Sequence, residues 1–265
     1  MVRDIALIGF GEAGSTFADA AKWTQRASGW DVLPCRRAAM TNLGVIDGAS
    51  LADTVAGASL ILSVVTADQS LAVAKACAPS LTAGSIWCDM NSVAPETKLA
   101  AARAIEADGG QYVDVAIMAP VNPARLGVPL LLAGPSAPEA EIALRSAGFS
   151  NVRIIGQEIG RASAIKMIRS VMIKGLEALT DEMMAAAEAA GVADELLASL
   201  DASEKVVPWR KRAEYCLERM ATHGARRAAE MEESAKTLLA LGVLPVMTRG
   251  TVYRQREAAG KGKQS

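Results

Sequence analysis

The sequence predicts an α/β fold in which a Rossmann-like, doubly wound and mostly parallel sheet is followed by an all-helical C-terminal domain. Short apolar segments alternate with helical segments up to about residue 156, as is typical of doubly wound α/β domains. A GxGxxG turn follows the first apolar segment. The later sequence has helical periodicity with breaks at glycine and proline. We expect domains at residues 1–157 and 158–258 and a flexible tail at 259–265.

The N-terminal turn predicts a dinucleotide site. Residues 5–8 form an expected buried strand, and the turn leads into an Ala-rich helix. Gly9 permits a tight turn, Gly11 lets the backbone approach a pyrophosphate, and Gly14 lets the helix pack on the strand. The helix N-terminus favours the anion. A tight βα turn without a ligand is the alternative. The expected cofactor contacts are Gly9, Phe10, Gly11, Glu12, Ala13 and Gly14.

The segment after this turn sets the expected choice of cofactor. We expect a helix over residues 12–27 and a second strand over residues 30–35. In this fold an acidic residue about 20 positions past the glycines binds the ribose 2′-hydroxyl, whereas arginine accommodates a 2′-phosphate. With these bounds no acidic residue ends the strand, and Arg36 and Arg37 follow it. Guanidinium groups bind phosphate through paired hydrogen bonds, so we favour NADP over NAD. Two solvated arginines are the alternative.

Strand and helix segments continue to alternate along the first half of the chain. The uninterrupted apolar run at 59–65 is typical of a central parallel strand. Because ligands bind beyond the carboxyl ends of strands in open α/β sheets, Val65 and Thr66 join the expected cofactor contacts. Other expected strands are 42–46, 85–88, 112–117, 130–133 and 152–155, and other expected helices are 50–56, 70–78 and 96–107.

The second half predicts a separate helical domain. Residues 160–190 contain no proline and a helical distribution of Ala, Met, Leu and Ile. The predicted helix is apolar on more than one face, as expected for a helix buried by other helices or by a partner subunit. Expected helix breaks follow at Gly191, Pro208, Gly242 and Pro245.

Composition argues against several classes of partner. The net charge of -1 provides no field that attracts nucleic acid or an anionic membrane, and only the end of the chain, with Lys261 and Lys263, has the character of a basic tail. The four cysteines lack CxxC spacing and there is 1 histidine, so we expect neither a disulfide framework nor a metal site. No signal-peptide pattern and no run of about 18 apolar residues is found. We expect a cytoplasmic protein.

Four segments of this chain together resemble a known family. Residues 9–14 contain its glycine turn, and residues 89–95 correspond to its Asp-x-Ser-Thr-x-x-Pro loop. Residues 114–120 correspond to an Asp-x-Pro-Val-Ser-Gly-Gly segment, and residues 160–170 to Gly-x-Gly-x-x-x-Lys-x-x-Asn-Asn. The chain thus resembles the β-hydroxyacid dehydrogenases, which include 3-hydroxyisobutyrate and 6-phosphogluconate dehydrogenase. It looks most like a divergent branch with a C-terminal helical domain of formerly unknown function.

The resemblance implies catalytic roles for four side chains. Lys166 would exchange the substrate hydroxyl proton, and Ser92, Asn91 and Ser170 would orient the substrate oxygen, with Asn91 also near the nicotinamide. A lysine in a closed, partly apolar cleft has a lowered pKa, which suits proton exchange. The alternative for Lys166 is a stem packed on an apolar helix with its ammonium group in water. The alternative for the serines and asparagine is capping of helices and turns.

The same resemblance implies where the substrate binds. Met118, Ala119 and Pro120 stand where the family binds a carboxylate, although Met118 and Pro120 lack the hydroxyl and the backbone donor of the family pattern. Arg169 replaces an asparagine of that pattern and could hold the anion from another direction. We therefore expect a small anionic substrate, whose identity the family pattern does not give.

A later helical face adds two candidate substrate contacts. His223 and Arg227 are spaced with Arg226 and Glu230 so that they share one face of a helix. This face could close the substrate pocket. A solvated charged surface is the alternative.

The lead hypothesis is an NADP-dependent oxidoreductase that acts on a hydroxy acid or related alcohol bound between the two domains. The resemblance implies a homodimer formed through the C-terminal helices. One alternative is an NADPH-dependent imine reductase, against which Lys166 argues because such enzymes usually have a different acid at that position. Another is a catalytically silent dinucleotide-binding sensor, which the altered segment 114–120 motivates. A methyltransferase would leave Gly14, Arg36, Arg37 and Lys166 unexplained.

Overall fold

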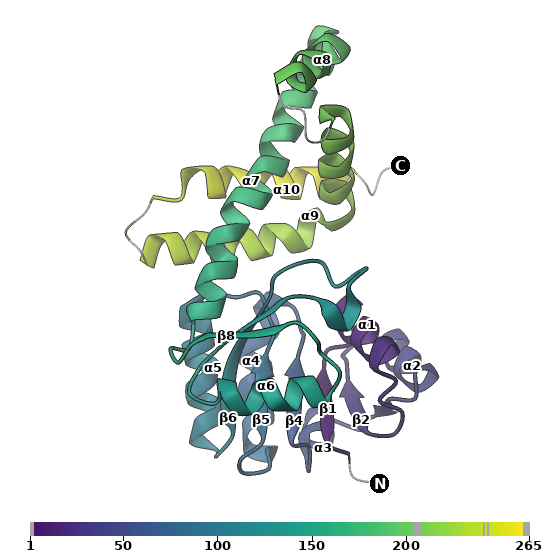
Figure 1. Cartoon of the computed structure of the whole chain (residues 1–265), viewed down its shortest axis with the longest axis vertical. Helices are drawn as coiled ribbons and strands as arrows, with labels where there is room; N and C mark the ends of the chain where they lie inside the picture. Colours follow the sequence, from purple (N-terminus) through teal and green to yellow (C-terminus); the bar gives the residue numbers. More distant parts are fainter. Residues whose placement is uncertain (1–2, 204–207, 241, 243, 262–265) are drawn as a thin grey trace. The chain divides into compact units, whose positions relative to one another are not determined.

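The computed structural model describes residues 3–203, 208–240, 242 and 244–261. The chain divides into two compact units, Met1–Lys166 and Met167–Ser265. The first unit is an α/β domain and the second is helical (Figure 1). The predicted fold class is therefore confirmed.

The first unit is built on an eight-stranded sheet, counted over the described residues, with the order β3-β2-β1-β4-β5-β6-β7-β8. Neighbouring strands are parallel except for β6 and β7, which are antiparallel. The order reverses beside β1, so the carboxyl ends of β1 and β4 flank the switch point at which such sheets bind ligands. The strands are β1 (Ile5–Ile8), β2 (Ala27–Trp30), β3 (Ile46–Asp47), β4 (Leu60–Ser63), β5 (Ile86–Asp89), β6 (Gln111–Ile117), β7 (Leu130–Ala133) and β8 (Val152–Gly156).

Helices cover both faces of this sheet. Side chains alternate between the faces along each strand, so Leu7 packs in one core cluster and Ile8 in another. Phe17 of α1 joins the first cluster, and Ile105 of α5 joins the second. The helices are α1 (Glu12–Ala21), α2 (Pro34–Asn42), α3 (Leu51–Val55), α4 (Ser70–Cys77), α5 (Pro95–Ala107) and α6 (Ala137–Ser146), with short 3₁₀ turns at Ala67–Gln69, Ala78–Ser80 and Arg125–Gly127.

The expected bounds of the first helix and the second strand are wrong. Helix α1 ends at Ala21 because Lys22 adopts the left-handed conformation, with φ 53°. Trp23 then turns into the core, where its indole Nε1 donates to Ala147 O at 2.9 Å. Strand β2 ends at Trp30, and Pro34 already begins α2, a helical position that suits its fixed φ. The residue that follows β2 is therefore Asp31, so an acidic residue does end this strand.

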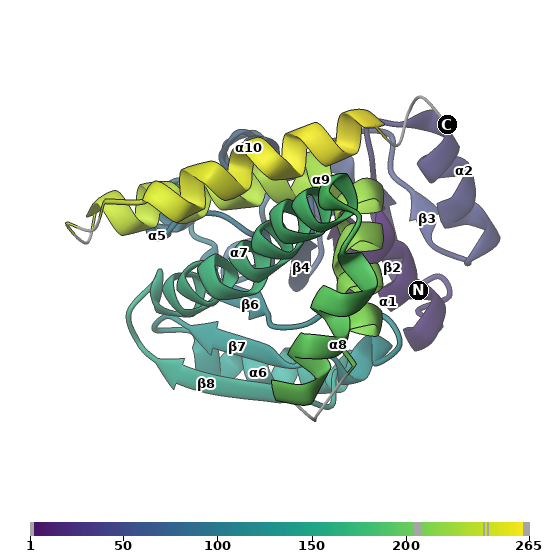
Figure 2. The same ribbon diagram turned by 90° about the horizontal axis from the view of Figure 1, so that it is seen from above.

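The second unit consists of long helices. Helix α7 (Arg161–Ala190) begins in the first unit and continues into the second, and it is followed by α8 (Ala193–Ser203), α9 (Trp209–Ala240) and α10 (Val246–Lys261). Helices α9 and α10 lie side by side in both views (Figures 1 and 2). The predicted long helix and the breaks at Gly191, Pro208, Gly242 and Pro245 are confirmed.

The expected tail is partly helical, since α10 extends to Lys261, and residues 262–265 lie outside the described residues. In the part of the chain that the structure describes, no helix combines the length and the hydropathy that crossing a bilayer requires.

Candidate functional site

The three glycines of the N-terminal turn differ in how much space surrounds them. Gly9 has φ +96°, and a Cβ atom there would lie 2.7 Å from Val64 O. A Cβ atom on Gly14 would lie 2.5 Å from Gly9 O. Gly11 has φ -77°, and its Cβ atom would meet Arg36 Nη1 first, at an ordinary 3.5 Å. The packing of this chain thus requires Gly9 and Gly14 but leaves room above Gly11, which fits the close approach of a ligand to the backbone.

Helix α1 presents its N-terminus at this turn. Gly11 occupies the N-cap position and has no side chain with which to cap the helix, so the first-turn N–H groups and the helix dipole face outward at Glu12 and Ala13. Phe10 contributes differently, because its ring is buried in the core and its N–H donates to Asp31 Oδ2 at 2.7 Å. The turn therefore has the donors and the charge that a pyrophosphate needs.

Asp31 ties this turn to the start of α2. Its side chain is 4% exposed, and its Oδ1 accepts from Leu33 N at 2.9 Å while its Oδ2 accepts from Phe10 N. Arg36 Nη1 lies 3.4 Å from Asp31 Oδ2. Arg37 lies elsewhere, since its Nε donates to Asp47 Oδ1 at 2.7 Å. Of the two arginines expected to hold a phosphate, the structure brings Arg36 to the glycine turn and pairs Arg37 with β3.

The end of β4 completes this part of the site. Val65 is half-buried, and its Cγ1 would lie 3.1 Å from a Cβ atom on Gly9. Thr66, the next residue, is exposed. The predicted contacts at the carboxyl ends of β1 and β4 therefore lie together.

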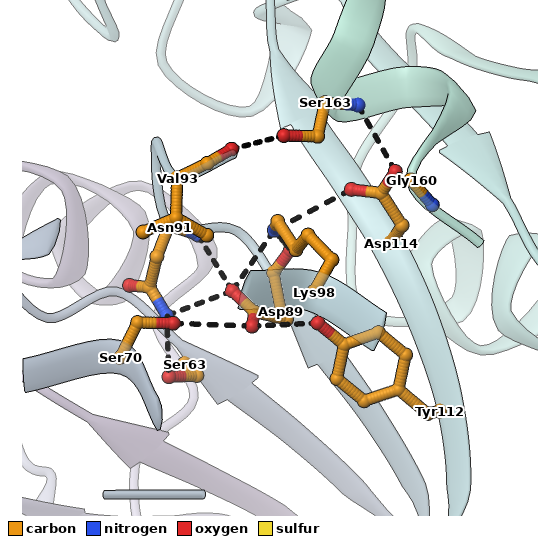
Figure 3. Close-up of polar contacts among 10 residues, drawn as sticks. All are labelled: Ser63, Ser70, Asp89, Asn91, Val93, Lys98, Tyr112, Asp114, Gly160 and Ser163. Atoms are coloured by element: carbon orange, nitrogen blue, oxygen red, sulfur yellow. Dashed lines mark hydrogen bonds and ion pairs between the residues drawn. The ribbon is translucent and has the colours of Figure 1, made fainter. Parts of the chain in front are cut away.

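A cluster of buried charges lies on the next two strands, at the end of β5 and in the middle of β6 (Figure 3). Asp89 of β5 and Asp114 of β6 are ladder partners. Lys98 of α5 donates from Nζ to Asp89 O at 2.6 Å and to Asp89 Oδ1 at 2.9 Å, and it pairs with Asp114 Oδ1 at 3.4 Å. These three side chains are at most 1% exposed. Burial raises the pKa of Asp114, and the Lys98 ammonium opposes this shift.

Two hydroxyl groups and Asn91 complete the environment of Asp89. Tyr112 OH donates to Asp89 Oδ2 at 2.7 Å, and Ser70 Oγ lies 3.3 Å from the same oxygen. Asn91 is 4% exposed, and its Nδ2 donates to Asp89 Oδ1 at 2.8 Å and to Ser63 Oγ at 2.9 Å. Its Oδ1 has no hydrogen-bond partner among the described residues and points away from Asp89 (Figure 3). This amide group is thus fixed by its nitrogen and has an unused acceptor.

Sequence reasoning missed Lys98, although a signal was present. The buried residues of α5 are Lys98, Ala101, Ala102 and Ile105. This i, i+3, i+4, i+7 spacing marks the core face of a helix. A lysine at the first position of such a face must find a buried anionic partner.

The first turn of α7 is anchored to the same cluster. Asp114 Oδ2 accepts from Gly160 N at 3.1 Å and from Ser163 N at 2.9 Å. Ser163 Oγ donates to Val93 O in the loop after β5. Lys166 lies one turn further along α7 and is half-buried. The structure thus joins the loop that carries Asn91 and Ser92 to the start of the helix that carries Lys166, within the first unit.

The predicted substrate residues of the first unit follow Asp114 in the sequence. Met118 is half-buried, and its N–H donates to Pro129 O at 2.9 Å. Ala119 and Pro120 are exposed. Ser92 is half-buried in the loop after β5.

The predicted residues of the second unit separate into exposed and buried groups. Arg169 is exposed and His223 is half-buried. Ser170 is 6% exposed, and its Oγ lies 3.4 Å from Lys174 Nζ. Arg227 is 4% exposed and forms an ion pair with Glu177.

Burial shifts the pKa values of Arg227 and of the neighbouring Lys174. Burial lowers the pKa of Arg227. Burial also lowers the pKa of Lys174, although its ion pair with Glu230 raises it.

Two family models match the sequence. Residues 4–145 match the NAD binding domain of 6-phosphogluconate dehydrogenase. Residues 187–258 match a domain of unknown function, DUF1932.

Similar proteins span almost the whole chain. An uncharacterized 28.5 kDa protein of Methanothermus fervidus is 30% identical over 254 residues, which are 93% of this chain and 95% of that protein. A conserved hypothetical protein from Sinorhizobium meliloti 1021 is 38% identical, with a TM-score of 0.74 over 97% of this chain and 88% of that one. The 3-hydroxyisobutyrate dehydrogenase of Mycobacterium tuberculosis has the same fold, with a TM-score of 0.79 at 14% identity over 99% of this chain and 95% of that one.

Proposed function

We propose that this chain, which belongs to the family that carries the NAD binding domain of 6-phosphogluconate dehydrogenase, is an NADP-dependent oxidoreductase. Its substrate would be an anionic hydroxy acid or a related alcohol, which it converts reversibly to the carbonyl compound. The observation that carries the proposal is the room above Gly11, which neither the backbone conformation nor the packing of the chain explains. Close approach of a dinucleotide does explain it.

The residues around Gly11 support NADP. The first-turn N–H groups of α1 would hold the pyrophosphate, and Val65 and Thr66 border the same strand ends. Arg36 is 44% exposed at its side chain and lies over Gly11, where it can bind a 2′-phosphate through paired hydrogen bonds. The negative charge of Asp31 disfavours a 2′-phosphate nearby. Both oxygens of Asp31, however, already accept main-chain N–H groups. We therefore assign the preference for NADP to Arg36.

The acid–base group in this proposal is Lys166. When bound, the nicotinamide cofactor supplies the donor or acceptor of the hydride. Lys166 Nζ takes the hydroxyl proton during oxidation and returns it to the carbonyl oxygen during reduction. Ser92 and Ser170 orient the substrate oxygen, and Asn91 offers its unused Oδ1 as an acceptor. Arg169, which is exposed, binds the substrate anion.

We also propose that the protein is a homodimer. In the second unit, α7 exposes apolar side chains at i, i+4, i+8 and i+11 positions, namely Ile168 (48% exposed), Met172 (71%), Leu176 (38%) and Leu179 (47%). A stripe of this kind is typical of a surface that packs against another subunit. Light scattering should give twice the chain mass of 27.6 kDa, and Met172→Glu should reduce it to the monomer mass. A monomeric wild-type protein would contradict this part of the proposal.

Nucleotide binding tests the role of the glycine turn. We expect Gly11→Ala to weaken NADPH binding at least about tenfold, because its Cβ atom occupies the space of the pyrophosphate. Its free energy of unfolding should fall by no more than about 1 kcal/mol. Gly14→Ala should instead destabilise the fold, because its Cβ atom would lie 2.5 Å from a carbonyl oxygen. Unchanged NADPH affinity in Gly11→Ala would show that no dinucleotide binds there.

A matched pair of arginine variants tests the cofactor preference. The wild type should bind NADPH more tightly than NADH, and Arg36→Ala should remove most of this difference. Arg37→Ala should retain it, because Arg37 pairs with Asp47. Equal affinities in the wild type, or loss of the difference in Arg37→Ala alone, would overturn the assignment.

Turnover tests the chemistry. We expect a screen of hydroxy acids with NADP and of keto acids with NADPH to find a substrate, and Lys166→Ala to lower kcat at least about 100-fold. Turnover of imines but not of keto acids would indicate the imine reductase instead. Tight NADPH binding without turnover of either class would indicate the silent sensor.

A further inference from the structure

The buried ammonium group of Lys98 joins two segments that both belong to the proposed site. Asp89 and Asp114 are neighbours in the β5–β6 ladder, where two carboxylates repel one another. Lys98 Nζ lies within 3.4 Å of both. Each carboxylate also accepts main-chain N–H groups from a segment that the proposed reaction uses.

Asp89 holds the loop that follows β5. Its Oδ1 accepts from Asn91 N at 3.0 Å and from Asn91 Nδ2 at 2.8 Å. The same oxygen accepts from Lys98. The position of Asn91 and of the adjacent Ser92 is therefore coupled to the carboxylate that Lys98 fixes.

Asp114 holds the start of α7. Its Oδ1 faces Lys98, whereas its Oδ2 accepts from Gly160 N and Ser163 N, in place of a capping side chain from the helix itself. Ser163 Oγ closes a ring of contacts by donating to Val93 O in the loop. The ring runs from Asp89 through Lys98, Asp114 and Ser163 back to the loop (Figure 3).

We propose that Lys98 is a positioning residue, which fixes the loop of Asn91 and Ser92 relative to the first turn of the helix that carries Lys166. The inference rests on the proposed function, because it concerns the geometry of that site. Lys98 itself touches no reacting atom. It acts through Asp89 on one side and through Asp114 on the other, and it supplies the positive charge that allows both carboxylates to remain at adjacent ladder positions.

The test compares Lys98→Met with Lys75→Met, an exposed lysine on α4. We expect Lys98→Met to lower kcat by roughly 10–100-fold, the effect of a small misplacement of catalytic groups. The Kd for NADPH should remain within about threefold of the wild type, because most of the proposed cofactor contacts lie at the glycine turn, on β1 and α1, and Asn91 alone belongs to the loop that Lys98 fixes. Lys75→Met should change neither quantity. Equal kcat values in Lys98→Met and the wild type would overturn the inference.

Hydrogen exchange gives a readout that does not depend on turnover. The acceleration of exchange in Lys98→Met should be at least about tenfold larger for the amides of Gly160 and Ser163, which donate to Asp114, than for amides of β1, whose exchange reports only the loss of global stability. If no substrate is found for the wild type, the proposed function fails but this exchange difference still tests the inference. Equal acceleration in β1 would show a general structural role and overturn it.

A second variant keeps the test decisive if Lys98→Met does not fold. Ser163→Ala removes the bond to Val93 O and leaves every charge in place. It should lower kcat several-fold without changing the Kd for NADPH. An unchanged kcat in this folded variant would contradict the coupling of the loop to α7.

Discussion

Both units of the molecule bury charged side chains, but they satisfy them differently. In the first unit, main-chain N–H groups of Asn91, Gly160 and Ser163 donate to Asp89 and Asp114 around Lys98. In the second unit, the ion pairs run from side chain to side chain between helices, from Lys174 to Glu230 and from Arg227 to Glu177.

The difference matters because main-chain donors cannot move without moving the fold. Strand register places Asp89 opposite Asp114, and the loop and helix ends are then fixed by the carboxylates. The helical pairs consist of long side chains, which can change rotamer and gain partial hydration after a substitution. We therefore expect the sheet cluster to be the less tolerant of the two, and the one on which the position of functional groups depends.

The largest effect should come from Lys98. Lys98→Met leaves two carboxylates buried without their ammonium partner, and we expect it to lower the free energy of unfolding by about 3–5 kcal/mol. Urea unfolding followed by tryptophan fluorescence measures this, since Trp87 is fully buried in β5. Lys75→Met should cost less than about 0.5 kcal/mol. A similar small loss in Lys98→Met would mean that the cluster does not need its positive charge.

A smaller effect is expected in the helical unit. Arg227→Met should lower the free energy of unfolding by about 2–3 kcal/mol, because Glu177 keeps Gln255 Nε2 at 3.2 Å and Arg219 Nε at 3.8 Å. The matched control is Arg226→Met, whose side chain is 55% exposed and whose pair with Glu230 spans 3.5 Å. It should cost about 0.5 kcal/mol or less. A loss in Arg227→Met larger than in Lys98→Met would reverse the comparison between the units.

The comparison also explains what could be read from the sequence. Periodicity and the GxGxxG turn predicted the α/β unit, the helical unit and the strand ends that carry Gly11 and Val65. These features follow from local spacing, which the sequence contains directly. The family match then agreed with the family that the four motifs resemble.

The incorrect or missing predictions concern residues whose positions are determined by tertiary contacts. Asp31 was overlooked because Lys22 ends α1 early and Trp23 turns into the core, which shifts β2 toward the N-terminus. Lys98 was overlooked because its partners come from β5 and β6, far away in the sequence. Arg227 was expected to contact the substrate, with a solvated surface as the alternative, whereas α7 supplies Glu177 as its buried partner. Long-range pairing of this kind leaves only a weak local signal.

The smallest effects should appear as opposite dependences of stability on pH. The pKa of Asp114 is raised by burial, so the folded chain binds the proton at a higher pH than the unfolded chain, in which the pKa is 3.8. The folded state is therefore favoured as pH falls through the folded pKa toward 3.8. The pKa of Lys174 is lowered from 10.5 by burial. The folded state loses this proton first, so its stability rises as pH increases toward 10.5.

Two substitutions separate these windows. Relative to Asp114→Asn, the wild type should gain stability as the pH falls from neutral to about 4. Relative to Lys174→Met, the wild type should gain stability as the pH rises in the alkaline range. Asp4→Asn provides a control of opposite sign to Asp114→Asn, because the hydrogen bond from Arg26 lowers the pKa of Asp4 and its contribution is lost in acid. Urea unfolding at each pH measures all three differences. If the Asp114→Asn difference had the sign of Asp4→Asn, the effect of Lys98 on the pKa of Asp114 would outweigh that of burial. The sheet cluster would then be held together by charge rather than by the main-chain donors that distinguish it from the helical pairs.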